Sequence, residues 1–461
     1  MNTVLRLNPR HQWASWALVP TAMLIALIFG LASVILPWFL VIGAALVLVL
    51  APTFILRPQW LLVPVVAFQM YAPSQPVADV VTVLYMLRCL APLSQRWKEQ
   101  GPLLAGKLMW PVYAIVLIAV LSLAVGIALG HDRSRLYGDG RVFVYWFWII
   151  PLLAFAPAKD SGRWFARQLL AIAVLVALLA VVQGSLGISL VSTGRVGALD
   201  SLSASADTVT RVQIPGFVFV MFGLFYSAAR LVKPGSAFTE RALYLGALLL
   251  LSLAIYYNFG RAIWFWSVLG LAITAVMLGW RASVKATLLG VVIVVTVGTA
   301  LSIAKPVLLD TMTDRVLSVF DEGGSQSSLG WRIAENRLAR KKLADSAYLG
   351  MALGGEYRMP VFGLRGFENH TSYIHNGHLS VMLRLGIVGY LAYVVLFVAM
   401  GLSLLKARRH PAQGALAAAS MAWLLTFVGQ NITQPDILSA HGVMLLVSLL
   451  VLSQMQARER G

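Results

Sequence analysis

The chain has 461 residues, of which 59% are hydrophobic and only 12% are charged. A soluble protein carries about twice that charged fraction, so the composition excludes an ordinary soluble domain. The net charge of +18 is read as the orientation signal of membrane loops, and no nucleic-acid partner is predicted. The single cysteine, Cys89, excludes an internal disulfide and a cysteine-based metal site.

Apolar runs of about 18 to 22 residues, long enough to span a bilayer, recur along the chain. They predict an all-α polytopic membrane protein with about 12–14 transmembrane helices. No cleavable signal peptide is expected, because a second apolar run follows the first almost directly. The helices are expected near residues 14–31, 34–53, 60–72, 78–93, 109–130, 142–157, 168–187, 215–231, 242–258, 262–280, 285–304, 377–404, 412–431 and 438–455.

The basic residues set the expected orientation. Clusters at 96–107, 159–167, 230–241, 281–285 and 406–409 all fall on one side, which makes that side and both termini cytoplasmic. The polar loop from His131 to Arg141 and the long segment 305–374 then lie on the opposite side. Four parts are expected: N-terminal helices 1–190, helices 191–304 with the arginines, the large loop 305–374, and C-terminal helices 375–461.

The large loop should contain a short helix from about Ser328 to Ala344. Trp331, Ala334 and Leu338 share one face of that helix at helical spacing. Its basic string, Arg337 to Lys342, fits a helix that meets anionic headgroups or lipid phosphates. The alternative is a solvated face, partly balanced by Glu335 and Asp345.

Carboxylates are scarce in the expected membrane-spanning segments. None is expected in mid-membrane, since Asp79 and Asp436 stand at helix boundaries, and ion-coupled transporters usually need such a group. His370, His375 and His378 lie close together, but no cysteine or well-spaced carboxylate completes a metal site. No phosphate-binding loop, metalloprotease motif or nucleophile elbow is present either.

Arg261 begins an expected transmembrane helix, where a guanidinium is costly unless it is paired or reaches the interface. It could clamp a phosphate or diphosphate, or it could be an interfacial anchor beside Trp264. Together with Arg211 and Arg195, it favours a converging phosphate site.

His375 stands where the polar loop ends and the next apolar helix begins. Histidine is a common general base, although an interfacial histidine at a helix end is the more frequent case. Asn376 could equally be the helix N-cap, and His378 is expected in packing. Gly386 and Gly389 are read as small residues that allow close helix approach.

These motifs resemble one family. His375-Asn376, followed after nine residues by Gly386-Ile387-Val388-Gly389, resembles the signature of the O-antigen ligase and polymerase superfamily. Gly260-Arg261-Ala262-x-Trp264 is similar to the family's arginine-bearing helix. Trp331-Arg332 and the segment 348–354 are similar to its loop helix and glycine turn, so the resemblance covers about residues 195–405.

The resemblance implies a GT-C-like, metal-independent, inverting glycosyltransferase without a cofactor, in the bacterial inner membrane with its site facing the periplasm. Its donor would be a glycan on undecaprenyl diphosphate. By that resemblance, His375 would deprotonate an acceptor hydroxyl, and the diphosphate and substrate would be held by Arg261, Arg211, Arg332, Arg195 and Asn376.

Several functions remain open at this point. A ligase would use lipid A-core as acceptor, whereas a polymerase of O-antigen or exopolysaccharide would use another lipid-linked repeat. A protein O-oligosaccharyltransferase would use a protein hydroxyl. The alternative of another class is a transporter of polysaccharide or lipid.

Overall fold

The computed structural model describes residues 53–54, 56–100, 108–157, 160–191, 195–198, 210–232, 237–285, 328–346, 348–359, 371–410 and 413–458, with isolated positions between 288 and 303. The backbone divides into two compact units, residues 1–61 and 62–461. The described part of the first unit contains the short helix η1 (Pro58–Leu61). All elements that follow belong to the second unit.

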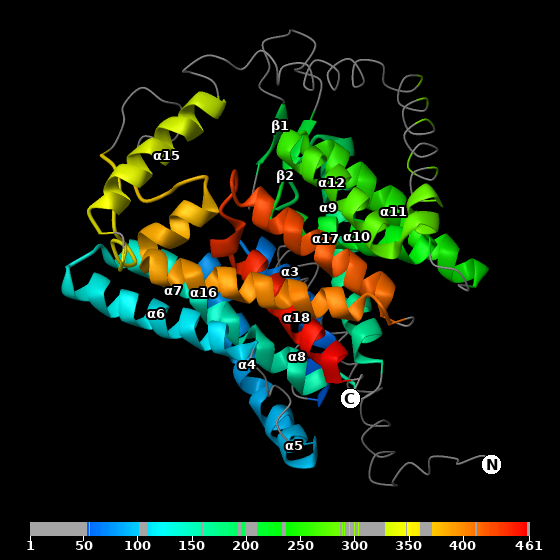
Figure 1. The fold of residues 1–461 in the computed structure, drawn as a ribbon, viewed down its shortest axis with the longest axis horizontal. Coiled ribbons are helices and arrows are strands. Elements are labelled where there is room, and N and C mark those ends of the chain that lie inside the picture. The colour runs from blue at the N-terminus through cyan, green and yellow to red at the C-terminus, as the bar shows by residue number, and fades with distance from the viewer. Residues whose placement is uncertain are drawn as a thin grey trace, which may run out of the picture. The chain divides into compact units, whose positions relative to one another are not determined.

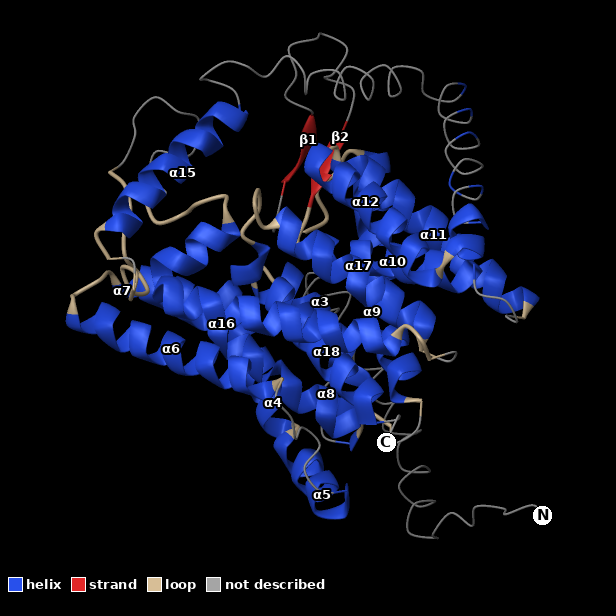
Figure 2. Ribbon diagram, viewed as in Figure 1, coloured by secondary structure: helices blue, strands red, loops and turns tan. Residues whose placement is uncertain are grey.

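The described part of the second unit is helical apart from one pair of short strands (Figures 1 and 2). Its N-terminal elements are α3 (Leu62–Tyr71), α4 (Gln75–Arg88), α5 (Leu90–Gln100), α6 (Met109–Ala128), α7 (Arg133–Val144), η2 (Tyr145–Trp148), α8 (Ile149–Phe155) and α9 (Ser161–Leu186). Then come β1 (Arg195–Ala198), β2 (Thr210–Gln213), α10 (Phe217–Val232), α11 (Phe238–Asn258) and α12 (Arg261–Leu278). The last are α15 (Ser328–Ala344), α16 (Gly377–Ala407), α17 (Gly414–Gln430), η4 (Asp436–Leu438) and α18 (Ala440–Arg458).

Seven helices within the described ranges are long and apolar enough to cross a membrane. Three shorter apolar helices accompany them, over Phe217–Val232, Gly414–Gln430 and Ala440–Gln454. The chain is therefore a helical polytopic membrane protein, as its composition predicts. The helices expected at 14–31 and 34–53, and most of the one at 285–304, lie outside the described residues.

The three shorter apolar helices form the centre of the second unit. Nearly all of α10 and α17 is buried, as is α18 from Val443 to Leu452. α10 packs against α9, α11 and α17, and α12 packs against α17. Alanines along one side of α17 allow the close approach that helix contacts in lipid require.

One segment expected as loop is helical. Residues 131–141 were predicted to be a polar loop, but α7 begins at Arg133 and continues through η2 and α8 as one span to Phe155. Asp132 caps it, accepting the backbone N–H of Arg135 at 3.0 Å. Residues 131–141 were predicted as a loop because they are too polar to belong to an apolar run. Several polar side chains of α7 instead have partners on other helices.

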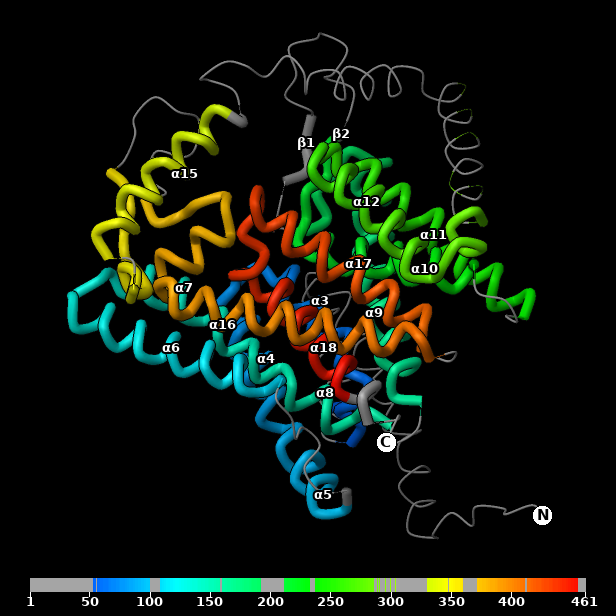
Figure 3. The backbone as a smooth tube through the Cα atoms, in the orientation of Figure 1, coloured from blue at the N-terminus to red at the C-terminus, as the bar shows by residue number. Residues whose placement is uncertain are grey.

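The turn after α15 is held between α6 and α16, which run side by side (Figure 3). The Ser122 hydroxyl on α6 donates to the carbonyl of Arg384 at 2.7 Å and accepts the N–H of Leu353 at 3.1 Å. The His131 ring donates from Nδ1 to the carbonyl of Leu353 at 2.7 Å. The loop is thereby fixed to the N-terminal helices.

α7 binds the same turn through charged groups. One oxygen of Asp139 accepts the backbone N–H of Gly354 at 2.9 Å, and the other pairs with Arg384 Nε at 2.8 Å. Arg135 forms an ion pair with Glu356. These contacts place the segment that leads toward His375 at a fixed position above α6 and α7.

α16 is broken near its start. Gly386 has φ of 68° and ψ of −178°, so residues 377–385 form a separate first section of the helix. A Cβ at Gly386 would collide with the carbonyl of Tyr348, and the N–H of Met351 donates to the carbonyl of Leu383 at 2.6 Å. Gly386 was predicted to allow close helix approach; the structure instead requires glycine there because of its positive φ and the nearby Tyr348 carbonyl.

Candidate functional site

His375 is held by a buried carboxylate. Its ring Nδ1 lies 2.8 Å from Oε2 of Glu335, and its backbone N–H donates to the same oxygen at 3.2 Å. Glu335 is 1% exposed. Because a carboxylate oxygen accepts, the contact places the hydrogen on Nδ1, and the neutral ring then presents Nε2 as its acceptor. That tautomer is the one a general base needs.

Glu335 is buried because α15 packs on the start of α16. Ala339 belongs to a small apolar cluster with Ile374, Leu379 and Leu383, and Glu335, one turn earlier, is also buried. The predicted boundaries of this helix are confirmed, and the face that Trp331, Ala334 and Leu338 share is not the buried one, since Leu338 is 38% exposed. The buried side lies one position further round the helix, so Glu335 is not on the exposed face that it was expected to balance, whereas Arg340, Lys341 and Lys342 are exposed.

A polar cavity of about 460 Å³ has Tyr373, two residues before His375, in its wall. The cavity wall includes Gln213, Ile263 and Tyr373. Each lies two positions along the chain from a predicted site residue. These neighbour Arg211, Arg261 and His375 in the chain. Within the described ranges the lining does not include those three residues themselves, but it brings together the segments that carry them.

The cavity wall is rich in groups that bind hydroxyls and phosphates. Its polar members are Gln69, Gln75, Arg141, Gln213, Asn258, Tyr373, Gln430, Gln434, Asp436, Ser439 and His441. Asn258 is 2% exposed, and its Oδ1 has no hydrogen-bond partner among the described residues. A buried acceptor of that kind is costly unless a ligand satisfies it.

Tyr373 connects His375 to the cavity. The two rings are edge to face, with centroids 5.0 Å apart. Burial raises the pKa of Tyr373 to about 12; the charges of Asp436 and Glu335 add to this effect, and Arg332 opposes it. The hydroxyl therefore stays protonated and can donate a hydrogen bond. The charge of Arg332 therefore acts on the Tyr373 hydroxyl.

Arg211 and Arg261 stand at one corner of the fold. Arg211 Nε donates to the carbonyl of Asn258 at 3.2 Å, and the Asn258 amide donates to the carbonyl of Val212 at 3.2 Å. Only Phe259, with φ of 50°, and Gly260 separate Asn258 from Arg261 at the start of α12. β2 is thus tied to the turn that leads into the arginine helix.

Arg195 lies on β1, whose antiparallel partner is β2. Its backbone stands opposite Gln213, and Gly197 stands opposite Arg211. The pairing of β1 with β2 brings Arg195 and Arg211 into one two-stranded sheet, which hydropathy alone does not reveal.

Two neighbours of His375 have structural partners. The Asn376 side chain accepts the backbone N–H of Leu379 at 3.1 Å, so the N-cap alternative is confirmed. His378 Nε2 donates to the carbonyl of Val428 at 2.8 Å, and Tyr390 packs edge-on against the His378 ring. His378 is a packing residue, as expected, and His370 lies outside the described residues.

The sequence gives no signal for a second histidine on the cavity wall. His441 Nε2 lies 3.6 Å from Oδ1 of Asp436, and Gln430 donates to the other oxygen at 3.3 Å. Asp436 lies on η4 and His441 in the first turn of α18, whereas Glu335 lies on α15 and His375 just before the cap of α16. The region therefore contains two histidine–carboxylate pairs.

The fold and site define a polytopic helical membrane protein with a histidine–carboxylate pair beside a polar cavity. Comparison of the sequence with protein-family models and with curated proteins finds no match. The function is therefore inferred from the arrangement of residues and from the motifs.

Proposed function

We propose that the protein is a membrane glycosyltransferase of the O-antigen ligase type. It transfers a glycan from undecaprenyl diphosphate to a hydroxyl of lipid A-core, at the periplasmic face of the bacterial inner membrane. The observation that carries the proposal is His375, oriented by Glu335 and in contact with Tyr373 on a polar cavity. The resemblance of the motifs around His375 and Arg261 supports the same reading.

The chemistry needs one base. Nε2 of His375 takes the proton of the acceptor hydroxyl as its oxygen attacks the anomeric carbon of the donor. The bond from that carbon to the diphosphate oxygen breaks, and the diphosphate leaves with the electron pair. Attack opposite the leaving group inverts the anomeric centre, and one step completes the transfer.

The leaving group gains negative charge as this bond breaks. Fixed guanidinium groups lower the barrier because they stabilise that charge without reorganising. Arg211 and Arg261 are held at the corner formed by β2 and α12, and Arg332 lies one turn before Glu335 on α15. We assign these three arginines to the diphosphate, together with Arg195, whose role rests on the resemblance alone. Because the Asn376 side chain caps α16, we assign it a positioning role next to His375 and not direct contact with the substrate.

A polymerase of the same superfamily is the second candidate, because the resemblance includes it. Lipid analysis of a deletion strain separates the two candidates. Lipopolysaccharide without O-antigen, together with intact lipid-linked polymer, supports the ligase. Accumulation of single repeats supports the polymerase, and a lipid intermediate trapped in the inner leaflet would contradict both and point to transport.

Reconstitution tests the reaction directly. Purified protein in proteoliposomes is given undecaprenyl-diphosphate-linked glycan with lipid A-core, with a second lipid-linked repeat, or with an acceptor protein. Transfer to lipid A-core is expected. Transfer only to one of the other acceptors would replace the ligase assignment by the polymerase or by the protein oligosaccharyltransferase, and no transfer to any acceptor would overturn the proposal.

A further inference from the structure

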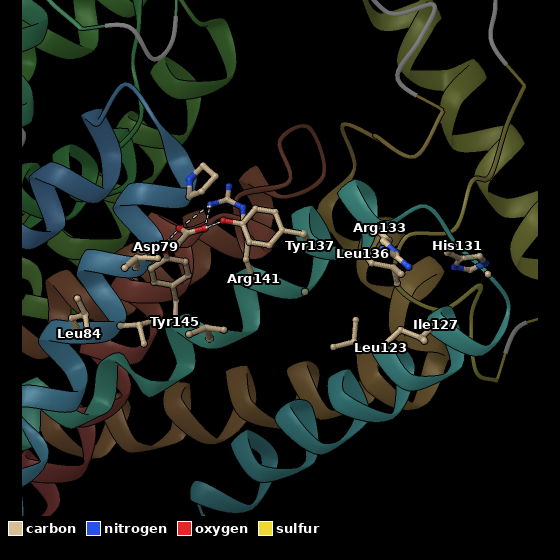
Figure 4. Close-up of a pocket in the computed structure, with 16 residues that line it drawn as sticks. Asp79, Leu84, Leu123, Ile127, His131, Arg133, Leu136, Tyr137, Arg141 and Tyr145 are labelled. Carbon is tan, nitrogen blue, oxygen red and sulfur yellow. Dashed lines mark hydrogen bonds and ion pairs between the residues drawn. The ribbon is translucent and has the colours of Figure 1, made fainter.

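A chain of hydrogen bonds leads from a carboxylate on α4 to the wall of the polar cavity. Figure 4 shows its first part, in which Asp79 pairs with Arg141 at 3.1 Å and accepts the hydroxyls of Tyr137, at 2.6 Å, and of Tyr145. The Tyr145 oxygen in turn accepts from Nε2 of Gln69, on α3, at 3.1 Å. Gln69 lines the polar cavity, so the chain ends at the candidate site.

The charge of Asp79 sets the direction of the bonds in this chain. A carboxylate paired with a guanidinium has no hydrogen to give, so the Tyr145 hydroxyl must donate to it. The Tyr145 oxygen can then only accept, and Gln69 must turn its NH₂ group toward it. The other end of the Gln69 amide, Oε1, has no hydrogen-bond partner among the described residues. Asp79 thus fixes the Gln69 amide with its oxygen as the acceptor that remains.

A second amide in the cavity wall is fixed in the same sense. Asn258 Nδ2 donates to the carbonyl of Val212 at 3.2 Å, which leaves Oδ1 without a partner within the described ranges. Gln69 and Asn258 are 3% and 2% exposed, so bulk water does not satisfy the two oxygens. A buried acceptor without a partner is costly. The two amides therefore indicate a ligand that donates hydrogen bonds.

The charges of the cavity wall do not favour an anionic occupant. Arg141 is the one guanidinium in the described lining, and Asp79 already neutralises it. Asp436 and His441 form a pair whose net charge is negative or zero in either state of the ring. A phosphate gains little from such a wall, whereas a neutral group with several hydroxyls can donate to the amide oxygens without repulsion. The cavity therefore suits the hydroxyl-bearing part of a ligand and not its diphosphate.

We propose that Gln69 and Asn258 are specificity-determining residues that accept hydrogen bonds from the first sugar of the donor, the one attached to the diphosphate. The backbone carbonyl of Asn258 accepts Nε of Arg211, an arginine assigned to the diphosphate, so hydroxyls and diphosphate meet at this residue. In the donor, only the first sugar is next to the diphosphate. Asp79 and Tyr145 are positioning residues that act through Gln69. The inference deepens the proposed function and rests on it for the identity of the donor.

Binding to the detergent-purified full chain tests the proposal with two probes, undecaprenyl diphosphate carrying one N-acetylglucosamine and undecaprenyl diphosphate without a sugar. Gln69→Met keeps the length of the side chain and removes its oxygen. Asn258→Ala removes the amide and leaves the backbone carbonyl that accepts from Arg211. Each should weaken binding of the sugar-bearing probe about two- to tenfold, the usual effect of one hydrogen bond. Binding of the sugar-free probe should not change, which also shows that each variant is folded.

Tyr145→Phe tests the chain that starts at Asp79. Without this hydroxyl the Gln69 amide loses its fixed orientation, so binding of the sugar-bearing probe alone should weaken. Tyr137→Phe is the matched control, because it removes a hydroxyl that donates to the same carboxylate from a residue outside the described lining of the polar cavity. Tyr137→Phe should bind both probes as the wild type does, and equal losses in the two tyrosine variants would overturn the positioning role.

Unchanged binding of the sugar-bearing probe by Gln69→Met and Asn258→Ala would overturn the proposal, as would equal losses for the two probes. In transfer assays Gln69→Met should raise KM for the donor and leave KM for the acceptor unchanged. A rise in KM for the acceptor alone would overturn the assignment to the donor sugar. Binding is measured without an acceptor, so the expected binding results with no glycan transfer would count against the proposed function alone. A wild type that binds neither probe would overturn both.

Discussion

Glu335 on α15 accepts both the backbone N–H and the ring Nδ1–H of His375, a residue 40 positions further along the chain. One carboxylate oxygen therefore fixes the position of the main chain and the orientation of the ring together. Since Glu335 is buried, solvent does not compete for this oxygen. Through these two hydrogen bonds, α15 contributes directly to the candidate site.

His375→Ala should abolish transfer, because the acceptor hydroxyl loses its base. General-base catalysis contributes about 10²–10⁴-fold, and a loss in that range is expected in reconstituted membranes. His441→Ala is the matched comparison, because His441 has its own carboxylate, Asp436, on the cavity wall. Near-normal transfer by His375→Ala with a large loss in His441→Ala would move the base to His441.

Glu335→Gln should lower kcat with little change in KM, because the amide keeps the shape of the side chain but removes the negative charge that supports the charged imidazole. A loss of up to about 10⁴-fold is expected, the effect of replacing the carboxylate of a Ser-His-Asp triad by an amide, which favours the other tautomer of the histidine. Glu335→Asp keeps the charge and should recover part of the rate. A rise in KM at unchanged kcat would show that Glu335 shapes the binding site and does not act through His375.

Arg261→Ala and Arg211→Ala should each reduce transfer by about 10²–10³-fold, the usual cost of removing one group that stabilises transition-state charge. Lysine at either position should restore only part of the rate, because it lacks the bidentate geometry of guanidinium. Arg281→Ala serves as the control, since Arg281 is an exposed residue beyond the other end of α12. Full activity in Arg261→Ala would remove that residue from the site.

Tyr373→Phe removes a hydroxyl from the cavity wall and keeps the ring that packs against His375. Because burial raises the pKa of Tyr373 to about 12, its hydroxyl keeps its proton to higher pH than an ordinary tyrosine. The variant should therefore be slower, with an unchanged shape of the pH–rate profile from about pH 6 to 10. A pH limb that disappears in Tyr373→Phe would mean that this hydroxyl titrates during turnover.

Gly386→Ala should destabilise the protein, because the left-handed φ of Gly386 is strained for alanine and the added Cβ would meet the Tyr348 carbonyl. A cost of about 1–3 kcal/mol is expected, measured as a lower unfolding temperature in detergent. Gly246→Ala, in open space within α11, should instead be neutral or stabilising. Equal unfolding temperatures for the two variants would contradict the assignment of the break in α16.

The sequence predicts helices well where an apolar run or a capping residue marks them. α6 begins at the expected residue, α15 has the expected bounds, and α16 begins at Gly377 after the cap at Asn376. Residues 131–141, which include most of α7, were predicted as a loop because polar and charged residues dominate this stretch. Asp139, Arg141 and Arg135 find their partners on other segments, which no local pattern contains.

The site was predictable in part, and for the same reason. His375 and Arg261 stand out because they belong to the motifs that resemble one family, and Arg211 stands out as a further cation expected near the same membrane face. Glu335 does not stand out, since a carboxylate on a basic helix resembles an ordinary exposed residue until its partner is known. The β1–β2 pair is four residues on each strand, too short for an alternating pattern to reveal.

The break in α16 also has a consequence for protein engineering. The carbonyl of Tyr348 occupies the space that a side chain at position 386 would take, and Met351 bonds to the helix just before the break. The glycine turn therefore packs closely against the first section of α16, with no room for a side chain at position 386. A chimaera that exchanges the segment between α12 and α16 with that of another protein should carry residues 348–386 as a single block, because a junction inside that block would separate two surfaces that pack against each other.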